Sequence, residues 1–248
     1  MSDFNRGFPR AATAPADMAV DAGLRAFMLG VYNKVALGLV LSAAMAYLTG
    51  SYPPVRDLMF QVRDNGMLGY TPVGLVVAFA PLAILLFSGI GRGAVTPQGS
   101  GIVYWAIVLL IGASLGTVVL LYTGASVAMT FLITAAAFGS LSLAGYTTKR
   151  DLTGFGSFLM MGVIGLLLAM VANIFLHSGG LAFIVNVLGV FIFAGLVAYN
   201  TQRLKMTYYQ LGGNSQALGV ATNYGALSLY INFINLFQFL LSFMGSRR

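Results

Sequence analysis

The feature that most constrains this chain is a series of seven apolar segments, each about as long as a helix that crosses a bilayer. They are 27–49, 69–90, 102–122, 126–147, 154–176, 181–201 and 218–243. A hydrocarbon core of roughly 30 Å needs about 20 helical residues, and backbone groups in lipid must hydrogen-bond within the segment. We therefore expect an all-α polytopic membrane protein, a seven-transmembrane-helix bundle over residues 25–248, after a polar cytoplasmic tail at 1–24.

Composition excludes most other classes. Only 8% of the residues are charged and 58% are apolar, whereas soluble domains carry roughly 25% charged residues. The six acids are all aspartates outside the long apolar runs, and cysteine is absent. Without paired acids or thiols in the membrane we expect no enzyme, no cofactor and no metal site. The single histidine, His177, has no nearby carboxylate. Basic residues scattered among loops indicate membrane lipid as a partner, and not nucleic acid.

The distribution of lysine and arginine predicts the orientation. With the N-terminus in the cytoplasm, eight basic residues fall inside and four outside, besides Lys34 near the inner end of the first helix. The inner set is Arg6, Arg10, Arg25, Arg92, Lys149, Arg150, Arg203 and Lys205, and the outer set is Arg56, Arg63, Arg247 and Arg248. The positive-inside rule favours a cytoplasmic N-terminus and an external C-terminus. A last segment that re-enters the membrane without crossing it would also fit the charges.

Small and hydroxyl side chains indicate how the helices pack. Gly112 and Gly116 form a GxxxG pair, which lets two backbones approach closely in lipid. We expect the serines inside the spans to bond to carbonyls of their own helices. They are Ser114, Ser140, Ser142 and Ser157.

Five motifs in order resemble the Bax inhibitor-1 (transmembrane Bax inhibitor motif) family in its bacterial branch. They are Leu24-Arg25-Ala26-Phe27-Met28, Tyr122-Thr123-Gly124-Ala125-Ser126, Gly145-Tyr146-Thr147-Thr148-Lys149-Arg150-Asp151-Leu152, Tyr199-Asn200-Thr201-Gln202-Arg203 and Ile231-Asn232-Phe233-Ile234-Asn235-Leu236-Phe237. The resemblance implies a bundle with a central last helix, in an inner membrane. It further implies a pH-sensitive calcium leak or, in some bacterial members, restraint of a membrane-bound AAA protease by a protein that does not conduct.

The resemblance also implies three site residues, and the chain departs from the family at two of them. The family places pH-sensing aspartates where this chain has Asn200 and Asn232, and a latching arginine that Arg92 matches. Asparagine does not titrate, and calcium prefers charged oxygen ligands. We therefore expect a cation leak, with calcium as the candidate ion, in which pH sensing is impaired or absent. An Asn200–Asn232 amide pair would preserve the hydrogen bond.

Polar and small residues form stripes on the last two predicted helices. Asn186, Gly189, Val197 and Asn200 share one face of the sixth, and Ala221, Gly225, Ser228, Asn232 and Asn235 share one face of the seventh. Such stripes face protein or water, so they fit a pore lining and structural hydrogen bonding equally well. Asn173 extends a small-residue face on the fifth helix. The predicted bounds place Asn200 near the inner boundary and Asn232 nearer the midplane.

Overall fold

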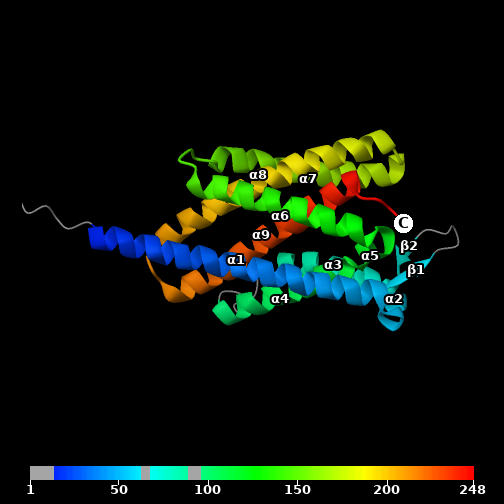
Figure 1. Cartoon of the computed structure of the whole chain (residues 1–248), viewed down its shortest axis with the longest axis horizontal. Helices are drawn as coiled ribbons and strands as arrows, with labels where there is room; N and C mark the ends of the chain where they lie inside the picture. The colour runs from blue at the N-terminus through cyan, green and yellow to red at the C-terminus, as the bar shows by residue number, and fades with distance from the viewer. Residues whose placement is uncertain (1–13, 63–67, 89–95) are drawn as a thin grey trace, which may run out of the picture.

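The computed structural model describes residues 14–62, 68–88 and 96–248, with side chains from residue 22 onward (Figure 1). Nine helices and two short strands occupy these ranges. They are α1 (Ala14–Ser51), α2 (Pro53–Met59), β1 (Phe60–Val62), β2 (Leu68–Tyr70), α3 (Pro72–Ser88), α4 (Pro97–Ser114), α5 (Gly116–Leu121), α6 (Gly124–Thr147), α7 (Thr153–Leu176), α8 (Gly179–Leu211) and α9 (Ser215–Met244). The antiparallel β1–β2 hairpin, which pairs Phe60 with Tyr70, is an addition to the expected all-α fold.

Six apolar stretches in the described ranges are long enough to cross a bilayer: Ala22–Ser51, Pro97–Leu121, Gly124–Thr147, Thr153–Leu176, Gly179–Leu211 and Ser215–Met244. The segment predicted at 69–90 corresponds to α3, whose 17 residues rise about 25 Å, less than the roughly 30 Å of a hydrocarbon core. The chain is therefore a helical membrane protein, and the count of seven spans stays a prediction.

The last helix lies in the middle of the bundle. Figure 1 shows α9 running between the pair α1 and α4 on one side and α6 and α8 on the other. Over its most apolar 18 residues, 56% of α9 is buried, against 11% for α7. α9 is one continuous helix of 30 residues, about 45 Å long, which is long enough to cross a bilayer and favours a spanning last segment. The start of α1 and the C-terminus lie at opposite ends of the bundle (Figure 1).

Local signals fix where the helices begin. Thr96, Thr123, Ser178 and Asn214 each accept a hydrogen bond from a backbone N–H of the first turn of the helix that follows. This is the capping role for which short polar side chains are favoured. The cap at Thr123 confirms the expected break between the third and fourth apolar segments.

Two helices are longer than expected. α1 begins at Ala14, so residues 14–24, expected in the polar tail, are helical. α8 continues to Leu211, ten residues beyond the predicted end at 201. Apolarity marks the part of a helix inside lipid, whereas a helix can extend into water wherever its residues have good helix propensity and no proline or glycine stops it. The glycines that end α8, Gly212 and Gly213, have φ of 55° and 84°.

The GxxxG pair, with Gly112 on α4 and Gly116 at the start of α5, allows these helices to approach α1 closely. A Cβ atom on Gly112 would lie 2.7 Å from Ser42 Cα and 3.0 Å from Met45 Cβ, and one on Gly116 would collide with Thr49 and Phe60. The Thr49 hydroxyl donates to the Ala113 carbonyl at 2.9 Å across the same interface. The predicted packing role of Gly112 and Gly116 is confirmed.

The C-terminal residues close the end of the bundle opposite the start of α1. Ser246 N donates to Ser126 Oγ at 2.9 Å. Thr123 N donates to Ser246 O at 3.1 Å, and Arg248 N donates to Leu121 O at 3.0 Å. These bonds tie the end of α9 to the turn between α5 and α6.

Candidate functional site: the polar interior around the last helix

Two buried asparagines on α9 carry side-chain atoms without hydrogen-bond partners. Asn232 is 5% exposed and its Nδ2 has no partner, and Asn223 is 4% exposed and its Oδ1 has none. Asn223 Nδ2 is satisfied, because it donates to Pro97 O at 2.8 Å and to Ser100 Oγ at 2.9 Å on α4. A buried polar atom without a partner costs about 1–3 kcal/mol, so these two atoms are the least satisfied part of the interior.

The register of α8 against α9 sets the separation of Asn200 and Asn232. Gly225 abuts Leu204, and Gly189 abuts Phe239, on two antiparallel helices. Asn200 is therefore level with Ser228, and Asn232 is level with Leu196 and Val197. The two asparagines lie about 5 Å apart along the bundle, or roughly one helical turn.

The structure thus reduces the difference in depth between Asn200 and Asn232 to about one helical turn, but it does not form the expected amide pair. Because α8 extends to Leu211, Asn200 lies well inside the helix and not at its end. Asn232 is buried, and Asn200 is half-buried. Within the described residues no hydrogen bond joins them, and Asn232 Nδ2 has no partner at all.

A chain of hydroxyl groups connects three helices beside Asn200. The Tyr32 hydroxyl on α1 hydrogen-bonds to the Ser142 hydroxyl on α6. Ser142 Oγ also lies 2.9 Å from Thr201 Oγ1 on α8, and Thr201 is fully buried. The expectation that Ser142 bonds to its own helix is therefore wrong, whereas Ser114, Ser140 and Ser157 do bond to carbonyls four residues earlier.

A second hydroxyl cluster lies where α1, α4 and α9 meet. Ser42 Oγ is 2.6 Å from Tyr230 Oη and donates to Val108 O at 3.1 Å. Ser42 is 2% exposed and Tyr230 is fully buried. Sequence reasoning missed Ser42, Tyr230 and Asn223. Asn223 had a usable signal, because it is the first of three asparagines in a helix that also carries Asn232 and Asn235.

The other predicted polar residues lie away from this pair or bond to other groups. Asn173 Oδ1 accepts from Ser178 N at 2.9 Å in the α7–α8 turn, and Asn186 Nδ2 donates to Ser242 Oγ on α9 at 3.1 Å. Asn235 Nδ2 donates to Ile231 O of its own helix at 2.9 Å. Ser228 is half-buried. Arg92 lies outside the described residues, so its expected latch contact stays a prediction.

Gln202, in the Tyr199–Arg203 motif of α8, also hydrogen-bonds to the connection between α6 and α7. Gln202 Nε2 donates to Arg150 O at 2.7 Å, and Gln202 Oε1 accepts from Leu152 N at 2.8 Å. Asp151, in the same connection, accepts from Thr153 N and Thr153 Oγ1 at 2.8 and 2.6 Å. These two hydrogen bonds lower the pKa of the Asp151 carboxyl below its ordinary value.

The interior contains no carboxylate as far as its side chains are described. The carboxylates among the described side chains are Asp57 and Asp151, and both lie outside the six long helices. Polar groups around α9 are amides and hydroxyls. Fold and interior together define the class: an integral helical membrane protein with a buried central helix that carries neutral polar groups.

Comparison with known proteins identifies the family. Residues 24–248 match the family described as "Inhibitor of apoptosis-promoting Bax1". The chain is 65% identical to an uncharacterized protein of Caulobacter vibrioides over the full length of both. It is 42% identical to the uncharacterized protein RP147 of Rickettsia prowazekii, over 95% of this chain and 96% of the relative. It is 39% identical to the inner membrane protein YbhL of Escherichia coli, over 92% of this chain and 94% of the relative. The chain belongs to the Bax inhibitor-1 family.

Proposed function

We propose that this protein is a cation leak path of the inner membrane, with calcium as one cargo, whose flux changes little with pH. The relative YbhL is an inner membrane protein, which supports the location. The family resemblance supports the leak. The weak response to pH is the proposal specific to this chain.

The observation that carries the proposal is that two side-chain amide atoms buried on α9 lack hydrogen-bond partners. In native proteins such groups call for an explanation, and a water molecule that accepts from Asn232 Nδ2 or donates to Asn223 Oδ1 is a common one. Asn223 and Asn232 are nine residues apart on α9, or about 13 Å along its axis. Nine residues are two and a half turns, so the two side chains lie on opposite sides of α9, with Asn223 against α4 and Asn232 level with Leu196 and Val197 of α8. The buried atom that fits a hydrated lining between α8 and α9, beside Asn200, is therefore Asn232 Nδ2.

Neutral oxygen ligands also suit a path through which calcium passes better than a site that binds calcium tightly. Hard Ca²⁺ binds tightly where several carboxylates surround it, and conduction requires binding weak enough for the ion to leave. Amide and hydroxyl oxygens coordinate calcium without holding it. They also keep their charge state at every physiological pH, so they provide no switch at positions 200 and 232.

The test is calcium flux into liposomes that contain the purified protein, measured between about pH 6 and 8. We expect flux in the native chain with little pH dependence. The double variant Asn200→Asp/Asn232→Asp places two carboxyl groups about one turn apart, where they titrate as a coupled pair, so its flux should vary with pH across this range.

Asn173→Asp is the matched control, because it makes the same change at the α7–α8 turn, where Asp keeps the acceptor for Ser178 N. It should leave the pH profile flat. Strong pH dependence of the flux in the native chain would refute the proposal that asparagines at positions 200 and 232 make the flux insensitive to pH. The single histidine, His177, would then be the next residue to test. Absence of flux in every variant, with the protein folded, would favour a non-conducting modulator of a membrane-bound AAA protease.

A further inference from the structure

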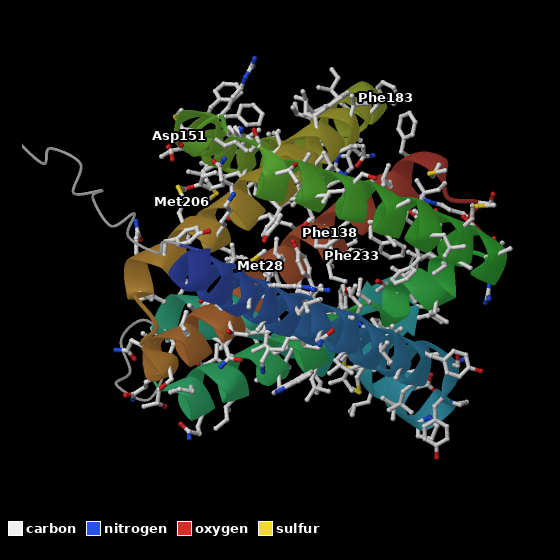
Figure 2. All side chains as sticks on the ribbon, turned by 60° about the vertical axis from the view of Figure 1, so that its left-hand side comes forward. Met28, Phe138, Asp151, Phe183, Met206 and Phe233 are labelled. Carbon is white, nitrogen blue, oxygen red and sulfur yellow. The ribbon has the colours of Figure 1, made fainter. Side chains whose placement is uncertain are left out.

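A groove of about 810 Å³ opens between α1 and α6 near the start of α1. α1 and α6 have little direct backbone contact, and the hydroxyl bond between Tyr32 and Ser142 bridges them. Figure 2 shows Met28 and Phe138 in the space between the two helices. The volume lies within the range of small-molecule sites, about 300–1,000 Å³.

The groove combines an apolar floor with a basic mouth. Met28 and Phe138, 4% and 8% exposed, form the floor, and the more exposed Leu29 and Leu143 line its sides. Arg25 is exposed at the start of α1 and also lines the groove. Arg25 forms no ion pair within the described residues, where the recorded ion pair is Arg56 with Asp57.

Further positive charge lies at the same end of the bundle. Lys205 Nζ donates to Tyr146 O at 3.2 Å and lies 5.4 Å from the centre of the Tyr146 ring, and Tyr146 lines the groove. Lys149 and Arg150 follow directly after α6. Asp151 is the described carboxylate of this connection, and its Oδ1 is already bonded to Thr153.

We propose that this groove binds an anionic phospholipid, with an acyl chain between Met28, Phe138 and Leu143 and the phosphate beside Arg25. Basic pockets between helices at a membrane face are a known setting for anionic headgroups. An acyl chain that enters the groove passes from the apolar bilayer into another apolar environment, so the transfer itself provides little driving force. The shape of the groove therefore determines whether the acyl chain fits, and the charge of the headgroup determines which lipid is preferred.

Substitution of a glycine that lines the groove offers a direct way to fill it with a larger side chain. Gly139 lines it, and a Cβ atom at this position would meet nothing within 4 Å. Gly139→Leu should therefore fold and occupy the space of the acyl chain. Gly165→Leu is the matched control, because Gly165 on α7 is also exposed and also has open space, away from the groove.

The experiment places the full chain in nanodiscs with equal amounts of phosphatidylglycerol and phosphatidylcholine, then counts retained lipids by native mass spectrometry. The native chain and Gly165→Leu should retain phosphatidylglycerol about fivefold over phosphatidylcholine, the worth of roughly one basic residue at an anionic surface. Gly139→Leu should lose most of this retained lipid. Arg25→Gln should bring the ratio of retained phosphatidylglycerol to phosphatidylcholine close to one, and Arg25→Lys should keep the ratio of the native chain.

Equal retention by Gly139→Leu and Gly165→Leu would overturn the proposal, as would an unchanged preference in Arg25→Gln. Displacement of the lipid by excess glycerol phosphate would also overturn it, because a phosphate site would then suffice without the chain. Melting temperatures in detergent check that the variants fold. If Gly139→Leu does not, Leu143→Trp enlarges an exposed wall residue of the groove and should cause the same loss.

Discussion

The contact between α1 and α4 yields the sharpest prediction about stability. Gly112→Ala adds one methyl group that would lie 2.7 Å from Ser42 Cα and 3.0 Å from Met45 Cβ. The first of these neighbours is backbone, so no side-chain rotation removes the clash. We expect α4 to move away from α1 as a unit.

The magnitude follows from what this movement costs. Overpacking by a methyl group costs about 1–3 kcal/mol. Separation also stretches two interhelical hydrogen bonds, from Ser42 Oγ to Val108 O and from Thr49 Oγ1 to Ala113 O, each worth about 0.6 kcal/mol in membrane proteins. The free energy of unfolding should therefore fall by about 2–4 kcal/mol.

The assay is reversible unfolding in detergent, with Gly165→Ala as the control. Gly165 has nothing within 4 Å of its missing Cβ, so alanine there should leave stability unchanged or raise it by up to about 1 kcal/mol through helix propensity. If Gly112→Ala proves as stable as Gly165→Ala, then the two helices do not approach as closely as described and the reasoning is wrong.

Three further predictions concern the ends of the bundle. Gln202→Leu leaves two backbone groups without their partner and should cost about 2 kcal/mol, with faster trypsin cleavage at Arg150. Hydrogen bonds from Thr153 lower the pKa of Asp151, so their stabilisation of this connection is present at neutral pH and is lost as the pH falls below about 4, which should lower the protection factor of the Thr153 amide against hydrogen exchange. Reporter fusions after residue 10 and at the C-terminus should report opposite sides of the membrane.

The helices follow from local properties of the sequence, which is why most could be predicted. Apolar runs mark what lies in lipid, and caps such as Thr123 and Ser178 mark where helices begin. The parts of α1 and α8 outside the apolar runs could not be found in this way. The hairpin at β1 and β2 also escaped, because its three-residue strands are too short for a periodic pattern.

The site was harder to predict, because its contacts join residues far apart in the chain. Ser142 and Thr201 lie 59 positions apart, and Ser42 and Tyr230 lie 188 apart. A serine in a helix bonds to its own backbone unless another helix offers a partner, and the sequence does not show which helix faces it. The polar stripe on α9 indicated a buried face correctly, since Asn232 is buried, but not that its amide would be unpaired.

The Tyr-Asn-Thr-Gln segment separates what preserves the fold from what sets the function. The Tyr199 ring packs against Gly156 of α7 so closely that no Cβ atom would fit there. Thr201 bonds to Ser142 on α6, and Gln202 clamps the connection between α6 and α7. Three of the four side chains thus hold α8 against its neighbours. Asn200 forms none of these bonds, so this position can exchange a carboxylate for an amide without loss of packing. We therefore expect a carboxylate at position 200 to alter titration and to leave the bundle folded.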